Sequence, residues 1–170
     1  AKLATRLGLA ALVAVIAAGL AQLGPEAPQE NHARLGKPVL PGFETLRDMA
    51  REIRITVADE SYTLERLDSG WTMKGMDGYR IRETALADLA NGLQGLVWGA
   101  ARTRDPEKFN RIGLGDPREG GTGALIELIN AEGKVETALI TGRRNDFLYG
   151  RLPDDSQAFR VEGDLPPLFT

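Results

Sequence analysis

Residues 124–141, ALIELINAEGKVETALIT, carry the clearest structural pattern in this chain. Residues 124–130 are dominated by leucine and isoleucine, as expected for a buried β-strand. Residues 131–134 have the composition of a hairpin turn, and residues 135–141 form a second strand-like run. The stretch therefore predicts two antiparallel strands joined by a short turn.

Further strands are expected on both sides of this hairpin. Apolar and polar residues alternate over residues 53–57, 62–66 and 71–73, as they do in half-buried strands. Short turns separate these three segments, which predicts a β-meander. After the hairpin, residues 147–151 and 158–161 are two more short strands between turns. The second half of the chain therefore predicts four short strands in a second meander.

One main helix is predicted between the two meanders, over about residues 84–98. Its apolar residues recur at helical spacing and form one stripe, which consists of Leu86, Leu89, Ala90, Leu93 and Val97. A helix packed against a mainly antiparallel sheet defines the α+β fold class, and this is the predicted class.

Three glycines, Gly92, Gly95 and Gly99, lie within this predicted helix or directly after it. Each weakens a helix by about 1 kcal/mol relative to alanine. We expect this loss to be offset by close packing of the helix on the sheet. The two tryptophans, Trp71 and Trp98, are expected to be core residues.

The N-terminal segment carries a different signal. From Leu7 to Leu23 there are seventeen residues without a charge, and Gln22 is the only clearly polar side chain. A helix of this length is roughly 26 Å long. That is the short end of what spans a membrane core of about 30 Å. We predict that residues 1–23 form a membrane anchor helix.

Two interpretations of this segment compete. A cleaved signal peptide is consistent with the small residues Gly19 and Ala21, which resemble a cleavage site. A retained anchor is the alternative, and it is favoured because the segment is part of the chain. Lys2 and Arg6 precede the apolar run, so the positive-inside rule places the N-terminus in the cytoplasm. The predicted location is the bacterial inner membrane, crossed once, with the remainder in the periplasm.

Small residues line one side of the predicted anchor. Ala10, Ala14 and Ala18 are spaced by four residues, and Ala17 and Ala21 repeat this spacing on a neighbouring face. Small residues at this spacing let membrane helices approach each other closely. We predict that these alanines contact an integral membrane protein within the lipid bilayer. An alanine-rich apolar helix without a partner is the alternative interpretation.

The rest of the chain divides into a linker and one domain. Residues 24–42 contain four prolines among polar residues, which predicts a semi-rigid linker. The linker includes His32, the only histidine. Residues 43–170 have the length of one domain and are predicted to form a periplasmic α+β domain. The sequence after Asp164 resembles the approach to a further element.

Composition excludes several classes of function. The formal net charge is −3 at pH 7, and the exported part is more acidic because Lys2 and Arg6 belong to the anchor. Nucleic acid is therefore not an expected partner. The chain has no cysteine, which excludes disulfides, thiol chemistry and lipid attachment through cysteine. One linker histidine cannot build a catalytic triad or a zinc site. We expect no enzyme activity, no cofactor and no metal.

Two local motifs were considered as binding sites. Residues 113–117, Gly-Leu-Gly-Asp-Pro, lack the spacing and the following helix of a dinucleotide-binding loop. They are expected to form a turn, because Asp116 is favoured at its first position. Arg143 and Arg144 are adjacent and could bind a phosphate or carboxylate on a partner. A solvated hairpin turn is the alternative for this pair.

Several of these segments occur in the order found in a known family. They are Ile53-Arg54-Ile55, Tyr62 to Arg66, Gly70 to Met73, the helix from Leu86 to Leu96, Phe109 to Pro117, Leu139 to Gly142 and Tyr149 to Pro153. In these motifs, about residues 37–165 resemble the family called domain of unknown function 4340. Members include auxiliary proteins of gliding-motility-type ABC transporters. Family members commonly continue beyond this length, and the family has no established activity.

The sequence therefore predicts a non-catalytic accessory or structural subunit of an inner-membrane protein complex. The family resemblance implies an ABC-type transporter as that complex. Two alternatives stay open at this point. One is a tethered periplasmic module that binds a ligand or peptide in a sheet groove or at a sheet edge. The other is a subunit of a photosynthetic or respiratory membrane assembly.

Overall fold

The computed structural model describes residues 33–168, which form the predicted α+β fold, built around one antiparallel eight-stranded sheet. The strands are β1 (Glu52–Val57), β2 (Glu60–Leu67), β3 (Gly70–Met73), β4 (Val97–Ala101), β5 (Ala124–Ile129), β6 (Val135–Arg144), β7 (Phe147–Arg151) and β8 (Phe159–Glu162). The helices are α3 (Phe43–Met49), α4 (Glu83–Gly95) and the 3-10 helices η1 (Pro106–Ile112) and η2 (Pro117–Glu119). The predicted anchor, residues 1–23, lies outside the described residues. Within residues 33–168, no helix combines the length and apolarity needed to cross a membrane.

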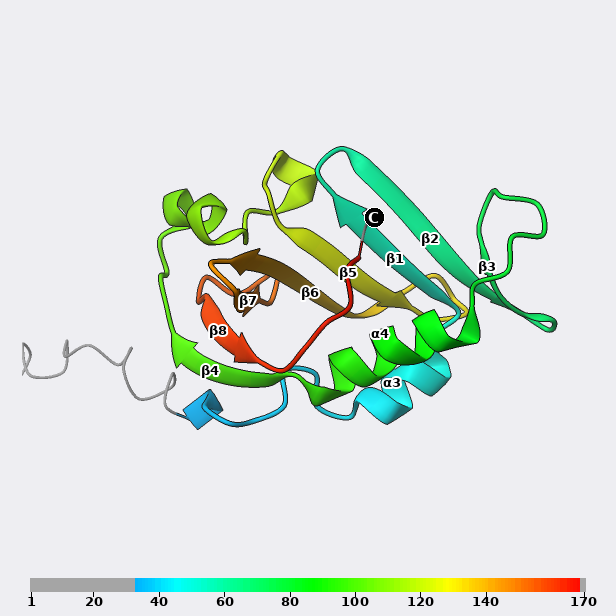
Figure 1. Ribbon diagram of the computed structural model, residues 1–170, viewed down its shortest axis with the longest axis horizontal. Helices are drawn as coiled ribbons and strands as arrows, with labels where there is room; N and C mark the ends of the chain where they lie inside the picture. The colour runs from blue at the N-terminus through cyan, green and yellow to red at the C-terminus, as the bar shows by residue number, and fades with distance from the viewer. Residues whose placement is uncertain (1–32, 169–170) are drawn as a thin grey trace, which may run out of the picture. The chain divides into compact units, whose positions relative to one another are not determined.

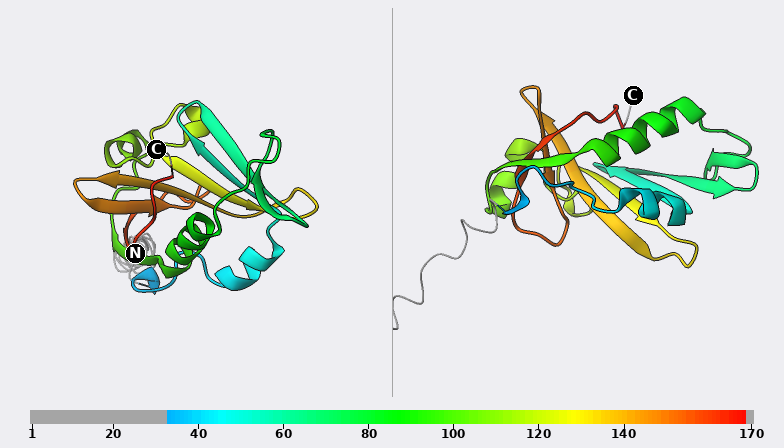
Figure 2. Two further views of the ribbon diagram at one scale, coloured as in Figure 1. Left: turned by 45° about the vertical axis from the view of Figure 1, so that its right-hand side comes forward. Right: turned by 90° about the horizontal axis from the view of Figure 1, so that it is seen from below.

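The two predicted meanders are parts of a single sheet, with the order β3-β2-β1-β5-β6-β7-β8-β4 (Figure 1). They are joined through the antiparallel pairing of β1 with β5, in which Ile53 lies opposite Leu128 and Ile55 lies opposite Ile126. Figure 2 shows that the sheet is strongly twisted, because β6 and β7 cross the direction of β1 and β2.

The chain crosses from one edge of this sheet to the other between β3 and β4. Helix α4 makes the crossing and lies beside α3 on one face, which we call the front face (Figure 1). Strand β4 then pairs with β8 at the far edge. The crossing leaves α3 and α4 as neighbouring covers over the same part of the sheet.

Strand β5 is buried on both faces. Ile126 and Leu128 point to the front and belong to the main core beneath α3 and α4. Leu125 points to the back, into a smaller core that also contains Phe109, Leu114, Ile140 and Ala158. The predicted hairpin of residues 124–141 is confirmed as β5 and β6, and its first strand occupies the centre of the sheet.

The predicted linker, residues 24–42, is too long. Val39 and Leu40 are 2% and 5% exposed and belong to the main core. The backbone just before them pairs with the outer edge of β4 through Pro38. The prediction was wrong here because the prolines of this segment prevent regular structure but do not prevent Val39 and Leu40 from packing into the core. The folded unit therefore begins at Arg34.

Helix α4 is shorter than the helix predicted over residues 84–98. It ends at Gly95, and Leu96 is extended, with φ −71° and ψ 131°. The following residues form β4, which the sequence analysis did not predict. Backbone hydrogen bonds hold β4 between β8 and residues 36–39. Pairing with segments distant in sequence thus overrides the helical spacing of Val97.

The three glycines of the predicted helix differ in their surroundings. A Cβ atom on Gly92 would lie 2.8 Å from the carbonyl oxygen of Asp164, so α4 packs closely on the C-terminal segment as well as on the sheet. A Cβ atom on Gly95 would meet nothing within 4 Å. Gly99 lies in β4, next to Trp98, which is buried as predicted. Close packing therefore accompanies Gly92, but against the C-terminal segment and not against the sheet as expected.

A loop packs backbone to backbone on β6. Gly113 has a φ of 72°, and it lies against Gly142 of β6. A Cβ atom on Gly142 would lie 2.0 Å from the carbonyl oxygen of Gly113. Within the same loop, a Cβ atom on Gly121 would lie 2.1 Å from the carbonyl carbon of Gly115. Only glycine fits these positions, because the atoms that a side chain would meet are backbone.

We predict that Gly142→Ala lowers the free energy of unfolding by roughly 1–3 kcal/mol, the usual range for overpacking. Gly95→Ala is the matched control, because its position at the end of α4 is open. Alanine there is expected to raise the free energy of unfolding by up to about 1 kcal/mol. Urea denaturation followed by circular dichroism measures both changes. Similar effects of the two substitutions would contradict the backbone contact.

Candidate functional site

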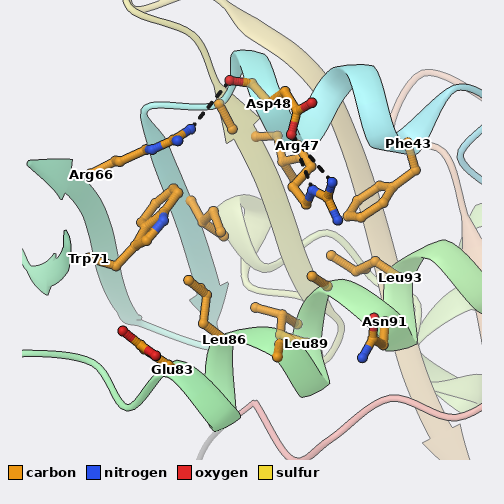
Figure 3. A pocket seen from close by; sticks show the side chains of 15 residues that line it. Phe43, Arg47, Asp48, Arg66, Trp71, Glu83, Leu86, Leu89, Asn91 and Leu93 are labelled. Atoms are coloured by element: carbon orange, nitrogen blue, oxygen red, sulfur yellow. Dashed lines mark hydrogen bonds and ion pairs between the residues drawn. The ribbon is translucent and has the colours of Figure 1, made fainter.

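A groove lies on the front face between α3 and α4 (Figure 3). Ile53 of β1 and Leu128 of β5 form its floor. Its walls are apolar side chains of the two helices, namely Phe43, Leu86, Leu89 and Leu93. The volume of this α3–α4 groove is about 320 Å³.

The groove exists because small side chains stand where larger ones would fill the space. Ala50 follows α3, and Ala87 and Ala90 lie on α4, and all three line the groove. Phe43 is the buried residue of α3, so one large side chain holds this short helix against the core. The leucines of α4 reach the sheet, whereas its alanines leave room between the helices.

The two ends of the groove differ. At one end, Nε2 of Gln94 on α4 donates a hydrogen bond to Oε1 of Glu44 on α3, at 3.1 Å. This exposed contact ties the two helices together beside the groove. At the other end, Arg66, Trp71 and Glu83 line an open mouth (Figure 3). Trp71 at this mouth is half-buried and packs against the main core, so the core position predicted from the sequence is confirmed in part.

Two guanidinium groups on the α3 side of the groove keep most of their donor capacity. Nε and Nη2 of Arg47 each lie 3.4 Å from Oδ1 of Asp48. Nη1 of Arg66 lies 3.4 Å from the backbone carbonyl oxygen of Asp48. Strong hydrogen bonds of this type measure about 2.7–3.2 Å. Figure 3 shows Arg47 and Arg66 on the α3 side of the groove and Glu83 on the α4 side.

The interior of the groove requires no polar ligand. Among residues 33–168, no fully buried side-chain nitrogen or oxygen atom lacks a hydrogen-bond partner. Binding inside the groove would therefore depend on removing apolar surface from water, which is worth about 25 cal/mol per Å². Charge recognition is confined to the mouth and rim.

A second, polar cleft lies around Arg151 on the back of the sheet. Arg151 is 6% exposed, and its guanidinium carbon lies 4.4 Å from the centre of the Phe109 ring. Its nitrogens donate to the carbonyl oxygen of Leu114 at 3.3 Å and 3.4 Å and to that of Pro153 at 3.0 Å. Burial lowers the pKa of Arg151. Because backbone carbonyls take up its donors, Arg151 fastens the surrounding loops and offers little to a ligand.

The turn predicted at Asp116 is confirmed beside this cleft. Asp116 caps η2, and its Oδ1 accepts a hydrogen bond from the backbone N–H of Arg118 at 2.9 Å. The Arg118 side chain also donates to Oδ2, at 2.6 Å. The hydrogen bond from this guanidinium holds the pKa of Asp116 below its ordinary value. The motif is thus a capped turn that shapes the loop.

The described part of the chain offers no recognisable catalytic or metal centre. The only histidine, His32, lies outside residues 33–168, and the chain contains no cysteine. Among the described residues, no three histidine, cysteine, aspartate or glutamate side chains gather where they could hold a metal ion. What this region offers for binding is apolar surface and arginine side chains.

The structure does not bring the predicted site residues together. Ala10, Ala14, Ala17, Ala18 and Ala21 lie outside the described residues. (Their predicted role in binding a membrane partner stays a prediction.) Arg143 and Arg144 are consecutive residues of β6, so their side chains point to opposite faces of the sheet.

The two arginines also differ in their contacts. Nη2 of Arg143 donates to Oδ1 of Asp164 at 2.9 Å and to the carbonyl oxygen of Leu165 at 2.8 Å. It therefore fastens the C-terminal segment to β6. Arg144 is exposed beside the turn at Asn145. This arrangement does not favour the binding of one phosphate by both arginines, which their adjacency in the sequence had suggested.

The groove and its two arginines were not predicted from the sequence. A signal for Arg66 was nevertheless present, because alternation along residues 62–66 places it on the same side as Tyr62 and Leu64. A charged residue on the apolar side of a strand needs either a partner or an opening to solvent. Arg47 gave no comparable signal. Its place beside the groove depends on how α3 packs on the sheet, which the local sequence does not reveal.

Comparisons with known proteins found no relative of this chain: no family model, no curated protein and no solved structure matches it.

We predict that Arg151→Lys lowers the free energy of unfolding by about 2–4 kcal/mol. A lysine ammonium cannot reach the carbonyl groups of Leu114 and Pro153 together, so buried acceptors lose their partners. The exposed Arg111 of η1 provides the control Arg111→Lys, for which a change within about 0.5 kcal/mol is expected. Urea denaturation measures both. A change in Arg151→Lys as small as that of the control would contradict the fastening role.

The Asp116–Arg118 contact predicts a pH dependence of stability. The pKa of Asp116 is lower in the folded chain than the unfolded value of about 3.9, so its stabilisation is present above that value. It is lost as the pH falls from about 5 towards the folded pKa. Asp116→Asn should therefore flatten the fall in unfolding free energy below about pH 5. Parallel curves for the two proteins, measured by denaturation at stepped pH, would count against this contact.

Proposed function

We propose that this protein is a non-catalytic accessory subunit of an inner-membrane complex. In this proposal residues 1–23 anchor it, and the folded domain lies in the periplasm. The uncharged run from Leu7 to Leu23, with Lys2 and Arg6 before it, supports the anchor and its orientation. The resemblance to the family called domain of unknown function 4340 favours an ABC-type transporter as the complex. A photosynthetic or respiratory assembly is the alternative.

The α3–α4 groove is the observation that carries a binding role for the folded domain. It combines an apolar floor with an open mouth at which Arg66 stands. Concave apolar sites with a few polar groups are the usual form of binding sites. The groove thus supports a domain that holds a ligand or a partner, rather than one that transforms a substrate.

A second candidate function follows from the same groove. The protein could act as a tethered module that captures a small ligand, because about 320 Å³ lies within the range of small-molecule sites, roughly 300–1,000 Å³. The two candidates are compatible, since an accessory subunit can present a ligand to its complex. They differ in whether a membrane partner is required.

Affinity purification of the tagged full-length protein from native membranes in a mild detergent tests the accessory role. We predict that one or more integral membrane proteins are recovered in stoichiometric amounts, as judged by mass spectrometry. Ala14→Leu together with Ala18→Leu should abolish this recovery, because larger side chains keep the helices apart. Gly19→Leu is the control, since in a helix Gly19 lies on the side opposite to Ala10.

The outcome separates the candidates. A full-length protein that runs as a detergent-bound monomer without a partner would rule out the accessory role. Loss of the partner with Gly19→Leu as well as with the alanine variants would show that the alanine face is not the contact. Recovery of the partner regardless of all three substitutions would place the contact elsewhere on the chain.

A further inference from the structure

We propose that the α3–α4 groove binds a free, single-chain alkyl carboxylate of about ten to twelve carbons. This inference rests on the binding role proposed above and names its ligand class. Three properties of the groove carry it: an apolar interior, a limited volume and two weakly engaged guanidinium groups.

The interior selects an alkyl chain. Floor and walls consist mainly of aliphatic side chains and Phe43, and the small residues Ala50, Ala87 and Ala90 keep a continuous channel between the helices. A flexible chain that enters at Trp71 can therefore extend inward between the helices as far as Leu93.

The volume limits the chain length. An apolar cavity of about 150 Å³ accommodates benzene, which has six carbons. On the same scale the groove, at about 320 Å³, takes roughly twelve carbons. A phospholipid with two long chains and a glycerol backbone exceeds this volume. The proposed occupant is therefore a free single-chain amphiphile, whose whole alkyl chain this volume can hold.

The charges at the rim select an anionic head. Arg47 and Arg66 have only contacts of 3.4 Å to Asp48, so their N–H groups are available for a carboxylate. The Asp48 side chain is 74% exposed and already faces Arg47. Glu83 stands alone on the α4 side of the mouth (Figure 3). Two arginines against one engaged aspartate make the α3 side of the rim attractive to an anion.

Fluorescence quenching with full-length protein in lipid nanodiscs tests this assignment without detergent in the groove. Bromododecanoate is the probe, because bromine quenches a tryptophan beside it. We expect saturable quenching of Trp71, after subtraction of empty nanodiscs, and loss of this component in Trp71→Phe. Trp98 is 5% exposed and does not line the groove, so it should contribute little.

Competition by unlabelled amphiphiles tests length and head group. Affinity should rise about fourfold for each methylene from octanoate to dodecanoate. It should stop rising beyond about twelve carbons, when the groove is filled. Dodecanol and dodecyltrimethylammonium should bind at least about tenfold more weakly than dodecanoate, because neither forms an ion pair with arginine: the alcohol is neutral and the ammonium is repelled.

Substitutions locate the site. Arg47→Gln combined with Arg66→Gln should weaken dodecanoate at least about tenfold and should leave dodecanol unchanged. Ala90→Phe should block every chain length by filling the channel. Arg111→Gln, on the exposed surface of η1, is the control and should bind like the unaltered protein. Circular dichroism confirms that each variant is folded before binding is measured.

Three results would overturn the assignment: no saturable quenching of Trp71, affinity that still rises from dodecanoate to hexadecanoate, or equal binding of the cationic amphiphile. The membrane purification described above is independent of this test. If the partner is recovered but dodecanoate does not bind, the ligand class is wrong and the accessory role stands. If dodecanoate binds and no partner is recovered, the protein is a tethered ligand-binding module.

Discussion

The pairing of β1 with β5 is the contact on which the rest of the fold depends. It joins two meanders that are separated in sequence by α4, and neither meander closes a core by itself. On the front, the pair contributes Ile53 and Leu128 to the core, and these two side chains are also the floor of the groove. On the back, Arg54 lies opposite Glu127, and their side chains approach to 3.4 Å. One strand pair therefore sets both the core and the site.

Small residues act in two opposite ways on this framework. At Gly142 the absent side chain lets the loop at Gly113 touch the backbone of β6, so space is removed. At Ala87 and Ala90 the small side chains stand beside solvent, so space is kept open between the helices. The difference lies in what each residue faces. Where a missing side chain faces backbone, the two backbone segments approach each other and the gap closes. Where small residues lie between helices that larger side chains hold apart, the gap persists.

Elements with a strong local pattern could be predicted from the sequence, and elements defined by distant pairing could not. Strands β1, β2 and β5 follow from alternating or continuous apolar residues. Strand β4 was missed because Val97 continues the apolar spacing of α4, and only its pairing with β8 makes it a strand. The burial of Val39 was missed for the same reason, since it depends on the edge of β4. The groove combines residues from six elements, α3, α4, β1, β2, β3 and β5, so no local sequence pattern predicts it.

The arginines show why a functional site cannot be inferred from residue type alone. Arg151 is buried, stacks on Phe109 and donates to backbone carbonyl groups, so its hydrogen-bonding capacity is used within the fold. Arg143 donates hydrogen bonds to the C-terminal segment. Arg47 and Arg66 instead lie beside the apolar groove, and their contacts to Asp48 are 3.4 Å long. An arginine whose donors are satisfied stabilises the chain, whereas one whose donors are unsatisfied beside a groove can recognise an anion. Free donor capacity, rather than charge, therefore distinguishes the binding arginines from the structural ones.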